Sequence, residues 1–167
     1  VDRLHIVHDV SHLSDRSLAD LLEMTDAPVI ASHSNCRALL GGENQRHLRD
    51  DTIREIGRRR GVIGLNLFSK FLLPPGAPSD AAQRATLDHC IAHIERVCEL
   101  IGHRRSIGLG SDMDGGFSAA ELPDTIDRPV HLTRLADALS SRGWTDDDLR
   151  AFACENWLRF FLNVTLR

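Results

Sequence analysis

Two short stretches decide the fold of this chain, Val7-His8-Asp9-Val10-Ser11-His12 and Val29-Ile30-Ala31-Ser32-His33-Ser34. Each is a short apolar run that ends near a histidine, and these two histidines, His12 and His33, stand 21 positions apart. The residues between them have the length of one helix, so the stretch predicts a strand, a helix and a second, parallel strand. Such a unit places the ends of two strands side by side. We therefore expect the two imidazoles at one edge of a parallel sheet, where they would be half of a metal site.

The same alternation continues along the chain. Strands are predicted at 4–10, 29–32, 62–67 and 106–109. Helices are predicted at 15–24, from Asp50 or Asp51 to Gly61, and at 79–101, 129–142 and 145–162, with Ser14, Gly102 and the pair Thr145 and Asp148 as capping signals. Strands that alternate with helices predict an α/β fold with a covered parallel sheet. About four parallel strands in 167 residues are half of a (β/α)8 barrel, so we expect a partial TIM-type barrel that forms a single domain over residues 1–167.

The composition excludes several classes of protein. The net charge of −4 gives no reason to expect nucleic acid or an anionic membrane as a partner. No apolar stretch approaches the roughly 20 residues that span a membrane. The four cysteines show neither zinc-ribbon spacing nor a dense disulfide framework, which favours a reducing compartment and predicts a cytoplasmic protein: Cys36, Cys90, Cys98 and Cys154.

Polar side chains stand at or just after the ends of the predicted strands, where catalytic groups of βα proteins collect. His12 follows the first strand, His33 comes at the end of the second, Asn66 is near the end of the third, and Asp112 follows the fourth. A single histidine at such a place is commonly just a packed or solvated imidazole. His12, His33 and Asp112 together favour a site. Arg46 lies in the loop after His33, and its planar guanidinium would suit a substrate carboxylate if it faces this edge.

The other histidines are expected to be structural or solvated. His89 and His93 have the i, i+4 spacing of a zinc-binding helix, but the glutamate of a metalloprotease motif is missing, and an outer barrel helix lies away from the catalytic edge. His47, His103 and His131 fall in loops or at a helix start, so we expect water around them.

Ordered motifs along the chain resemble the membrane (renal) dipeptidase family, peptidase family M19. They are Asp9-Val10-Ser11-His12-Leu13-Ser14, Pro28-Val29-Ile30-Ala31-Ser32-His33-Ser34-Asn35, Gly108-Leu109-Gly110-Ser111-Asp112-Met113-Asp114-Gly115 and the ending Asn156-Trp157-Leu158-Arg159-Phe160-Phe161. The resemblance implies a (β/α)8 barrel that hydrolyses dipeptides with two zinc ions. It implies that His12 and His33 bind one zinc and that Asp112 handles the substrate amine and proton transfer. Arg46 would hold the dipeptide carboxylate, and His47 replaces the family's usual asparagine after it.

The resemblance also shows what this chain lacks. In the family, a His-x-Asp pair on the first barrel strand holds the other zinc, and a glutamate bridges both ions. No residues here match them, so the chain is similar to the carboxyl-terminal half of the barrel. We expect two zinc ions in a complete site, at most one weakly held by this chain, and little or no hydrolysis by the chain alone. Exposed sheet edges favour a homodimer or a missing amino-terminal half as partner.

Two other functions fit the same residues. An amidohydrolase-type metal hydrolase that acts on cyclic amides or esters would also place two histidines and an aspartate after successive strands. Arg46 distinguishes it, because a dipeptide needs a group that binds its carboxylate and a neutral amide does not. The other possibility is a catalytically inactive remnant, which the missing ligands favour for this chain as it stands.

Overall fold

The computed structural model describes residues 2–77 and 83–165, and its centre is a parallel sheet. The strands are β1 (His8–Asp9), β2 (Val29–Ala31), β3 (Val62–Leu65) and β4 (Ile107–Leu109). They lie in the order β1-β2-β3-β4, and each pair is parallel. The predicted α/β fold with four parallel strands is confirmed.

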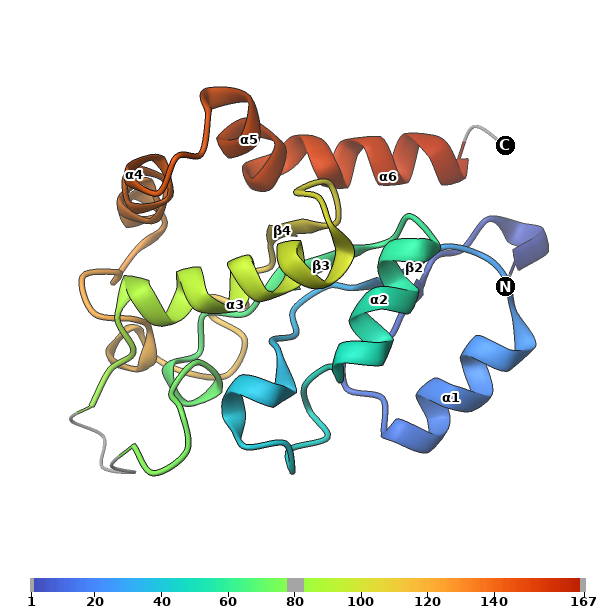
Figure 1. The fold of residues 1–167 in the computed structure, drawn as a ribbon, viewed down its shortest axis with the longest axis horizontal. Coiled ribbons are helices and arrows are strands. Elements are labelled where there is room, and N and C mark those ends of the chain that lie inside the picture. The colour runs from blue at the N-terminus through green and yellow to red at the C-terminus, as the bar shows by residue number, and fades with distance from the viewer. Residues whose placement is uncertain (1, 78–82, 166–167) are drawn as a thin grey trace.

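Helices connect neighbouring strands and follow the last one (Figure 1). The connecting helices are α1 (Asp15–Met24), α2 (Asp50–Arg58) and α3 (Leu87–Ile101). After β4 come α4 (Thr133–Ser141), α5 (Asp146–Arg150) and α6 (Asn156–Thr165), and a π-helical segment, Ala151–Glu155, joins the last two. The three predicted caps are present: the Ser14 side chain accepts a hydrogen bond from Ser17 N, Gly102 ends α3 in the left-handed conformation, and Thr145 and Asp148 form a capping box. The chemistry of these caps explains why the helix starts were visible in the sequence.

Helices cover the two faces of the sheet separately. Neighbouring residues of a strand point to opposite faces. On one face, Ala31 and Ile63 pack with apolar side chains of the connecting helices, among them Ile53, Ile56, Ile91 and Ile94. On the other face, Ile30 and Val62 form a smaller core with Phe160 of α6. Figure 1 shows α6 lying on the opposite side of the sheet from α1, α2 and α3.

Close packing of α6 depends on a glycine in β4. A Cβ atom at Gly108 would lie 2.5 Å from Trp157 Nε1, so only glycine leaves room for this indole. Trp157 Nε1 donates to Leu109 O at 3.0 Å. The buried Asn156 side chain donates to Arg104 O and Ile107 O, both at 2.8 Å. These contacts fix α6 to the last strand.

Several element boundaries differ from the prediction, and the largest differences lie at the first strand and at the start of the long helix. The first strand was expected at 4–10, but residues 2–4 form a 3-10 turn, His5 has a φ of 53°, and only His8 and Asp9 pair with β2. Asp2 holds this turn back against the sheet, because its carboxylate pairs with His8 Nε2 and accepts from Thr25 Oγ1.

The long helix was predicted to start at Ser79, which lies outside the described residues. Residues 83–86 are not helical, and α3 begins at Leu87. Thr86 caps it together with His89 in a capping box. The apolar pattern therefore predicted a start that is too early. The true cap was not recognised, because histidine takes the place of the usual glutamate in its capping box.

Candidate functional site

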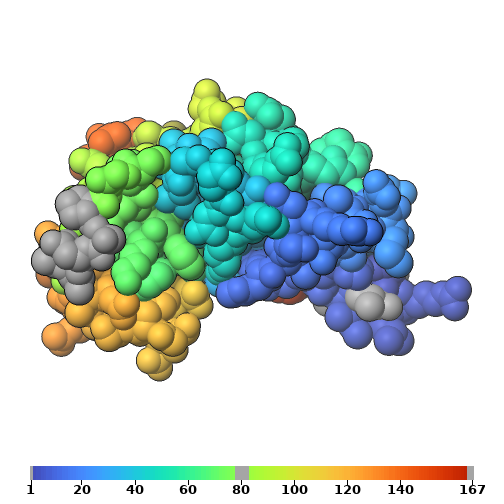
Figure 2. Space-filling model, turned by 90° about the horizontal axis from the view of Figure 1, so that it is seen from below, coloured from blue at the N-terminus to red at the C-terminus, as the bar shows by residue number. Residues whose placement is uncertain are grey.

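The segments that follow the four strands lie along one edge of the molecule, as parallel pairing requires. They run from blue (after β1) through cyan and green to orange (after β4), side by side in chain order (Figure 2). Together they form an arc that is open on one side. The predicted site residues come from the first, second and fourth of these segments.

His12 and His33 point their Nε2 atoms at one another, 2.8 Å apart. At that distance one ring donates and the other accepts, so at least one Nε2 carries a proton. The rings are tilted by 57°, with their centroids 4.9 Å apart. His33 Nδ1 is 2.6 Å from Ser32 Oγ, which orients this ring from its far side. The prediction that parallel strands would bring these two imidazoles together therefore agrees with the geometry.

A small polar network fixes the two turns that carry the histidines. Asp9 Oδ1 accepts from the backbone N–H groups of Ser11 and Ser32, both at 3.0 Å, and so ties the end of β1 to the end of β2. Ser11 Oγ accepts from His33 N at 3.1 Å. His12 itself has a φ of 69°, a left-handed conformation that costs a non-glycine residue roughly 1 kcal/mol or more. The network holds His12 in that conformation.

Arg46 faces the same edge. Its Nη1 donates to Ser34 Oγ at 2.9 Å and its Nη2 to His33 O at 2.8 Å, while the guanidinium carbon lies 5.4 Å from the centre of the Phe71 ring. These three contacts hold the guanidinium next to the second histidine. Among residues 2–77 and 83–165, Nη1 and Nη2 each keep one N–H group without an acceptor, whereas Nε is buried.

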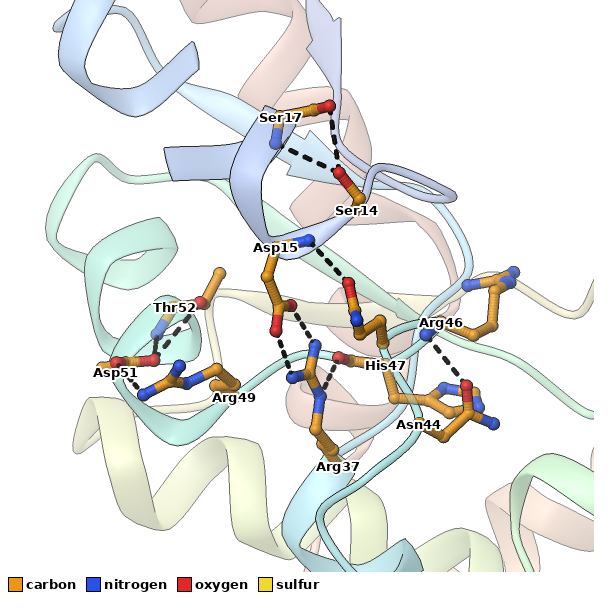
Figure 3. A network of polar contacts seen from close by, with 11 residues as sticks. Ser14, Asp15, Ser17, Arg37, Asn44, Arg46, His47, Arg49, Asp51 and Thr52 are labelled. Atoms are coloured by element: carbon orange, nitrogen blue, oxygen red, sulfur yellow. Dashed lines mark hydrogen bonds and ion pairs between the residues drawn. The ribbon is translucent and has the colours of Figure 1, made fainter. Parts of the chain in front are cut away.

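A buried arginine supports the loop that carries Arg46 (Figure 3). Arg37 makes a bidentate pair with Asp15 at the start of α1, at 2.8 and 2.5 Å, and its Nε donates to His47 O at 2.8 Å. Asn44 Oδ1 accepts from Arg46 N at 3.0 Å. The loop is thus joined to the helix that follows His12. The sequence analysis missed Arg37, because its partner lies 22 positions away.

Asp112 follows β4 with a φ of 56°, a second left-handed residue at this edge. Its Oδ2 accepts from the buried Asn66 Nδ2 at 2.8 Å. Gly115 packs against it so closely that a Cβ atom there would lie 2.2 Å from Asp112 Oδ1. Asn66, noted in the sequence only for its position near a strand end, is therefore a direct partner of the candidate catalytic carboxylate.

The charged groups of this edge act on one another. Burial lowers the pKa of His33, and the Asp112 carboxylate opposes that shift. Burial also lowers the pKa of Arg46, against the opposing effects of Asp112 and Asp9. Burial raises the pKa of Asp9, but hydrogen bonds from Ser32 and Ser11 and the nearby His33 outweigh it, so the net pKa is low. The charges of His33, Arg46 and the carboxylates Asp9 and Asp112 are thus coupled to one another.

The histidines fit part of a zinc site. Two Nε2 atoms that converge from neighbouring strands are suitable donors, since neutral imidazole is a common zinc ligand. Within residues 2–77 and 83–165, however, no group of three or more His, Cys, Asp or Glu side chains could hold a metal ion. The described residues therefore offer two donor atoms, fewer than the three protein ligands of a usual catalytic zinc site.

His47 corrects the prediction that it is solvated. The ring is buried, packs edge-on against Phe71 with centroids 4.6 Å apart, and accepts from Asn35 N at Nδ1. Burial lowers its pKa to about 3. His93 is also buried and accepts from Cys36 N, while His89 caps its own helix, so both have structural partners instead of forming a metal site.

Comparison with known proteins gives one consistent family. The family model described as membrane dipeptidase (peptidase family M19) matches residues 1–166. An uncharacterized dipeptidase of Schizosaccharomyces pombe is 37% identical over 115 residues, which are 69% of this chain and 26% of that protein. A Klebsiella pneumoniae protein from the pqqA 5′ region is 31% identical over 164 residues, which are 98% of this chain and 57% of that protein.

Solved structures agree with this result. A metallopeptidase from Rhodobacter sphaeroides, crystallised with a phosphinate mimic of the dipeptide L-Ala-D-Ala, is 30% identical with a TM-score of 0.83. The match covers 96% of this chain and 43% of that one. It confirms the predicted fold class, an α/β segment of a (β/α)8-type barrel. The chain spans between 26% and 57% of the length of these relatives. Among its described helices, none is long and apolar enough to cross a membrane.

Proposed function

Because the chain belongs to the membrane dipeptidase family, peptidase family M19, we propose that it forms the carboxyl-terminal part of a zinc-dependent dipeptidase site. The observation that carries this proposal is the edge where His12 and His33 meet beside Arg46. The phosphinate bound to the R. sphaeroides relative mimics a dipeptide, which supports dipeptides as the substrate class. The remaining ligands would come from polypeptide that corresponds to the part of the relatives outside the match.

His12 and His33 would bind one zinc ion through their Nε2 atoms. When bound, zinc ions would polarise the scissile carbonyl group and lower the pKa of the attacking water. A catalytic zinc site normally has three protein ligands. With two, we expect this chain to bind at most one ion, and weakly, and to hydrolyse dipeptides slowly or not at all.

Arg46 and Asp112 would bind the two charged ends of the substrate. The guanidinium of Arg46 is held by Ser34 and by the His33 carbonyl, and its remaining N–H groups suit a carboxylate. The Asp112 carboxylate would accept hydrogen bonds from the substrate ammonium group and take part in proton transfer. Opposite charges at fixed positions favour a short substrate that carries both.

Zinc titration of the 167-residue chain tests the ligand assignment. We expect calorimetry to show weak binding of one ion, and loss of that binding in His12→Gln and in His33→Gln. His103→Gln is the matched control, because that histidine is exposed and lies at the other end of β4. Tight binding of two ions, or equal binding by all three variants, would contradict the assignment.

The contacts of Arg46 favour a dipeptidase over an amidohydrolase that acts on cyclic amides or esters. Hydrolysis of alanyl dipeptides in the presence of zinc should be slow or absent with this chain alone. In the full reading frame that contains it, hydrolysis should fall about 10- to 100-fold in Arg46→Met, as expected for loss of a charged hydrogen bond. Equal rates for Arg46→Met and the unchanged protein would instead support the amidohydrolase. Absence of hydrolysis in every form would support an inactive remnant.

We also propose that the open arc is completed by another polypeptide, either a second copy of this chain or an amino-terminal half. The sheet ends at β1 and β4, and the two arc ends do not meet. Sedimentation that shows a stable, well-folded monomer would count against the homodimer, and zinc affinity that rises on adding the amino-terminal half of a relative would support the other arrangement.

The four cysteines are free thiols, two of them fully buried, which supports the proposal of a reducing compartment such as the cytoplasm. Fractionation of cells that express the full reading frame tests this location directly.

A further inference from the structure

Every polar atom of Asn66 makes a hydrogen bond. Its backbone N–H donates to Asn35 Oδ1 and its backbone carbonyl accepts from Asn35 Nδ2, both at 3.0 Å. Its side-chain Oδ1 accepts from Phe68 N at 2.8 Å. Because Oδ1 must face that N–H group, the network fixes the amide orientation and directs Nδ2 at Asp112. The side chain is fully buried, so water cannot substitute for these partners.

Asn35 keeps Asn66 in place from a different loop. Its Nδ2 also donates to Phe71 O at 2.7 Å, and its backbone N–H donates to His47 Nδ1 at 3.3 Å. The paired hydrogen bonds between Asn35 and Asn66, here called the clamp, therefore join the loops that follow β2 and β3. One of these loops carries Arg46 and the other supplies the amide that contacts Asp112.

The clamp holds one oxygen of the Asp112 carboxylate and leaves the other available. Oδ2 is bound to Asn66, whereas no hydrogen bond to Oδ1 is present within the described residues. Arg46 and Asp112 carry opposite charges, and the carboxylate opposes the effect of burial, which lowers the pKa of the guanidinium. Even so, among residues 2–77 and 83–165 no ion pair within 4.0 Å joins them. Each charge has its own neutral partners instead.

We propose that Asn66, fixed by Asn35, is a positioning residue that keeps the Asp112 carboxylate from collapsing onto Arg46. The two opposite charges then stay apart and free to bind the opposite ends of a dipeptide. This inference rests on the proposed function, since it assigns Asp112 and Arg46 to the substrate's ammonium and carboxylate groups.

Nuclear magnetic resonance of the 167-residue chain tests the clamp without needing activity. In Asp112→Asn, the side-chain amide signals of Asn66 should move, while those of the buried Asn156 at the other end of β4 should not. In Asn66→Asp, which keeps the acceptor for Phe68 N but replaces the donor, the Arg46 Nε–H signal should shift. Asn66→Ser gives a second, smaller variant in case the first fails to fold. Unmoved Asn66 signals in Asp112→Asn, or unmoved Arg46 signals in a folded Asn66 variant, would overturn the inference.

Kinetics of the full reading frame separate this inference from the proposed function. For alanyl dipeptides, kcat/KM should fall about 10- to 100-fold in Asn66→Asp. The same substitution should cause little further loss in an Asp112→Asn background, because a residue that acts through Asp112 has no effect without it. Additive losses would overturn the positioning role. Unchanged hydrolysis in Asp112→Asn would instead overturn the role given to Asp112 under the proposed function, whatever the resonance data show.

Discussion

Two pairs of histidines show how surroundings decide what an imidazole does. His12 and His33 lie at the edge of the sheet, partly in contact with water, and their Nε2 atoms face each other. His47 and His93 are buried, and each accepts a backbone N–H at Nδ1. Because both of these rings are buried, neither offers a nitrogen to a ligand that arrives from solvent. The exposed pair is therefore suited to a ligand, and the buried pair contributes to stability only while it stays neutral.

The largest expected effect is a loss of folding stability in acid, caused by protonation of the buried pair, His47 and His93. Burial lowers the pKa of His47 to about 3 and that of His93 to about 4, below the ordinary 6.5. Between those values and 6.5 the unfolded chain binds more protons than the folded one, so stability is full above pH 6.5 and falls as the pH is lowered. Each histidine contributes up to about 1.4 kcal/mol per pH unit in this window. Urea unfolding at pH 7, 6 and 5 measures the slope.

His93→Gln isolates one of these contributions. The pKa of His33 is also lowered, so it adds to the slope in the same direction, while carboxylates with lowered pKa act mainly below pH 4.5. Because this variant lacks one titrating ring, its free energy of unfolding should depend less on pH, whatever its value at pH 7. A stability that is flat between pH 7 and 5 would contradict the burial of both rings.

Truncation of a buried ring should have the next largest effect. His93→Ala removes side-chain packing against the Cys36 segment and leaves Cys36 N without its acceptor. We expect a loss of about 2–4 kcal/mol in the free energy of unfolding at pH 7. The exposed His103→Ala should change it by less than about 0.5 kcal/mol. Similar losses in the free energy of unfolding for both variants would contradict the structural role given to the buried His93.

A substitution at the edge of the sheet should change the stability less than truncation of a buried ring. His12→Gly relieves a left-handed φ of 69°, but it also makes the unfolded chain more flexible. These effects oppose one another, so the free energy of unfolding should stay within about 1 kcal/mol of its original value. Zinc binding should nevertheless be lost. A large destabilisation in thermal unfolding would show that His12 serves the fold as much as the site.

The edge was predictable because it depends on local patterns. Short apolar runs predict strands, parallel strands end on the same side, and so His12, His33 and Asp112 could be assigned to one edge before any coordinates. The helix caps at Ser14 and Thr145 were equally local. Features that depend on partners distant in sequence were missed. Burial of His47 needs Phe71 and Asn35, and the loop that holds Arg46 needs a pair between Arg37 and Asp15.

The first strand shows the opposite error. Its apolar residues predicted seven paired positions, but Leu4 and Ile6 are 72% and 55% exposed, and Asp2 folds the segment back. An apolar pattern indicates that a segment tends to form a strand, but the strand forms only where a neighbouring strand is present to pair with it. The single-domain prediction and the roles of the four site residues remain predictions.

The packing of α6 has a consequence for synthesis. This helix follows all four strands in the sequence, and its Phe160 packs on the face formed by Ile30 and Val62. While the chain grows on a ribosome, that face stays uncovered until α6 has emerged, and its apolar residues are free to associate with other nascent chains or to recruit chaperones. This face of the sheet is thus covered only after α6 has been synthesised.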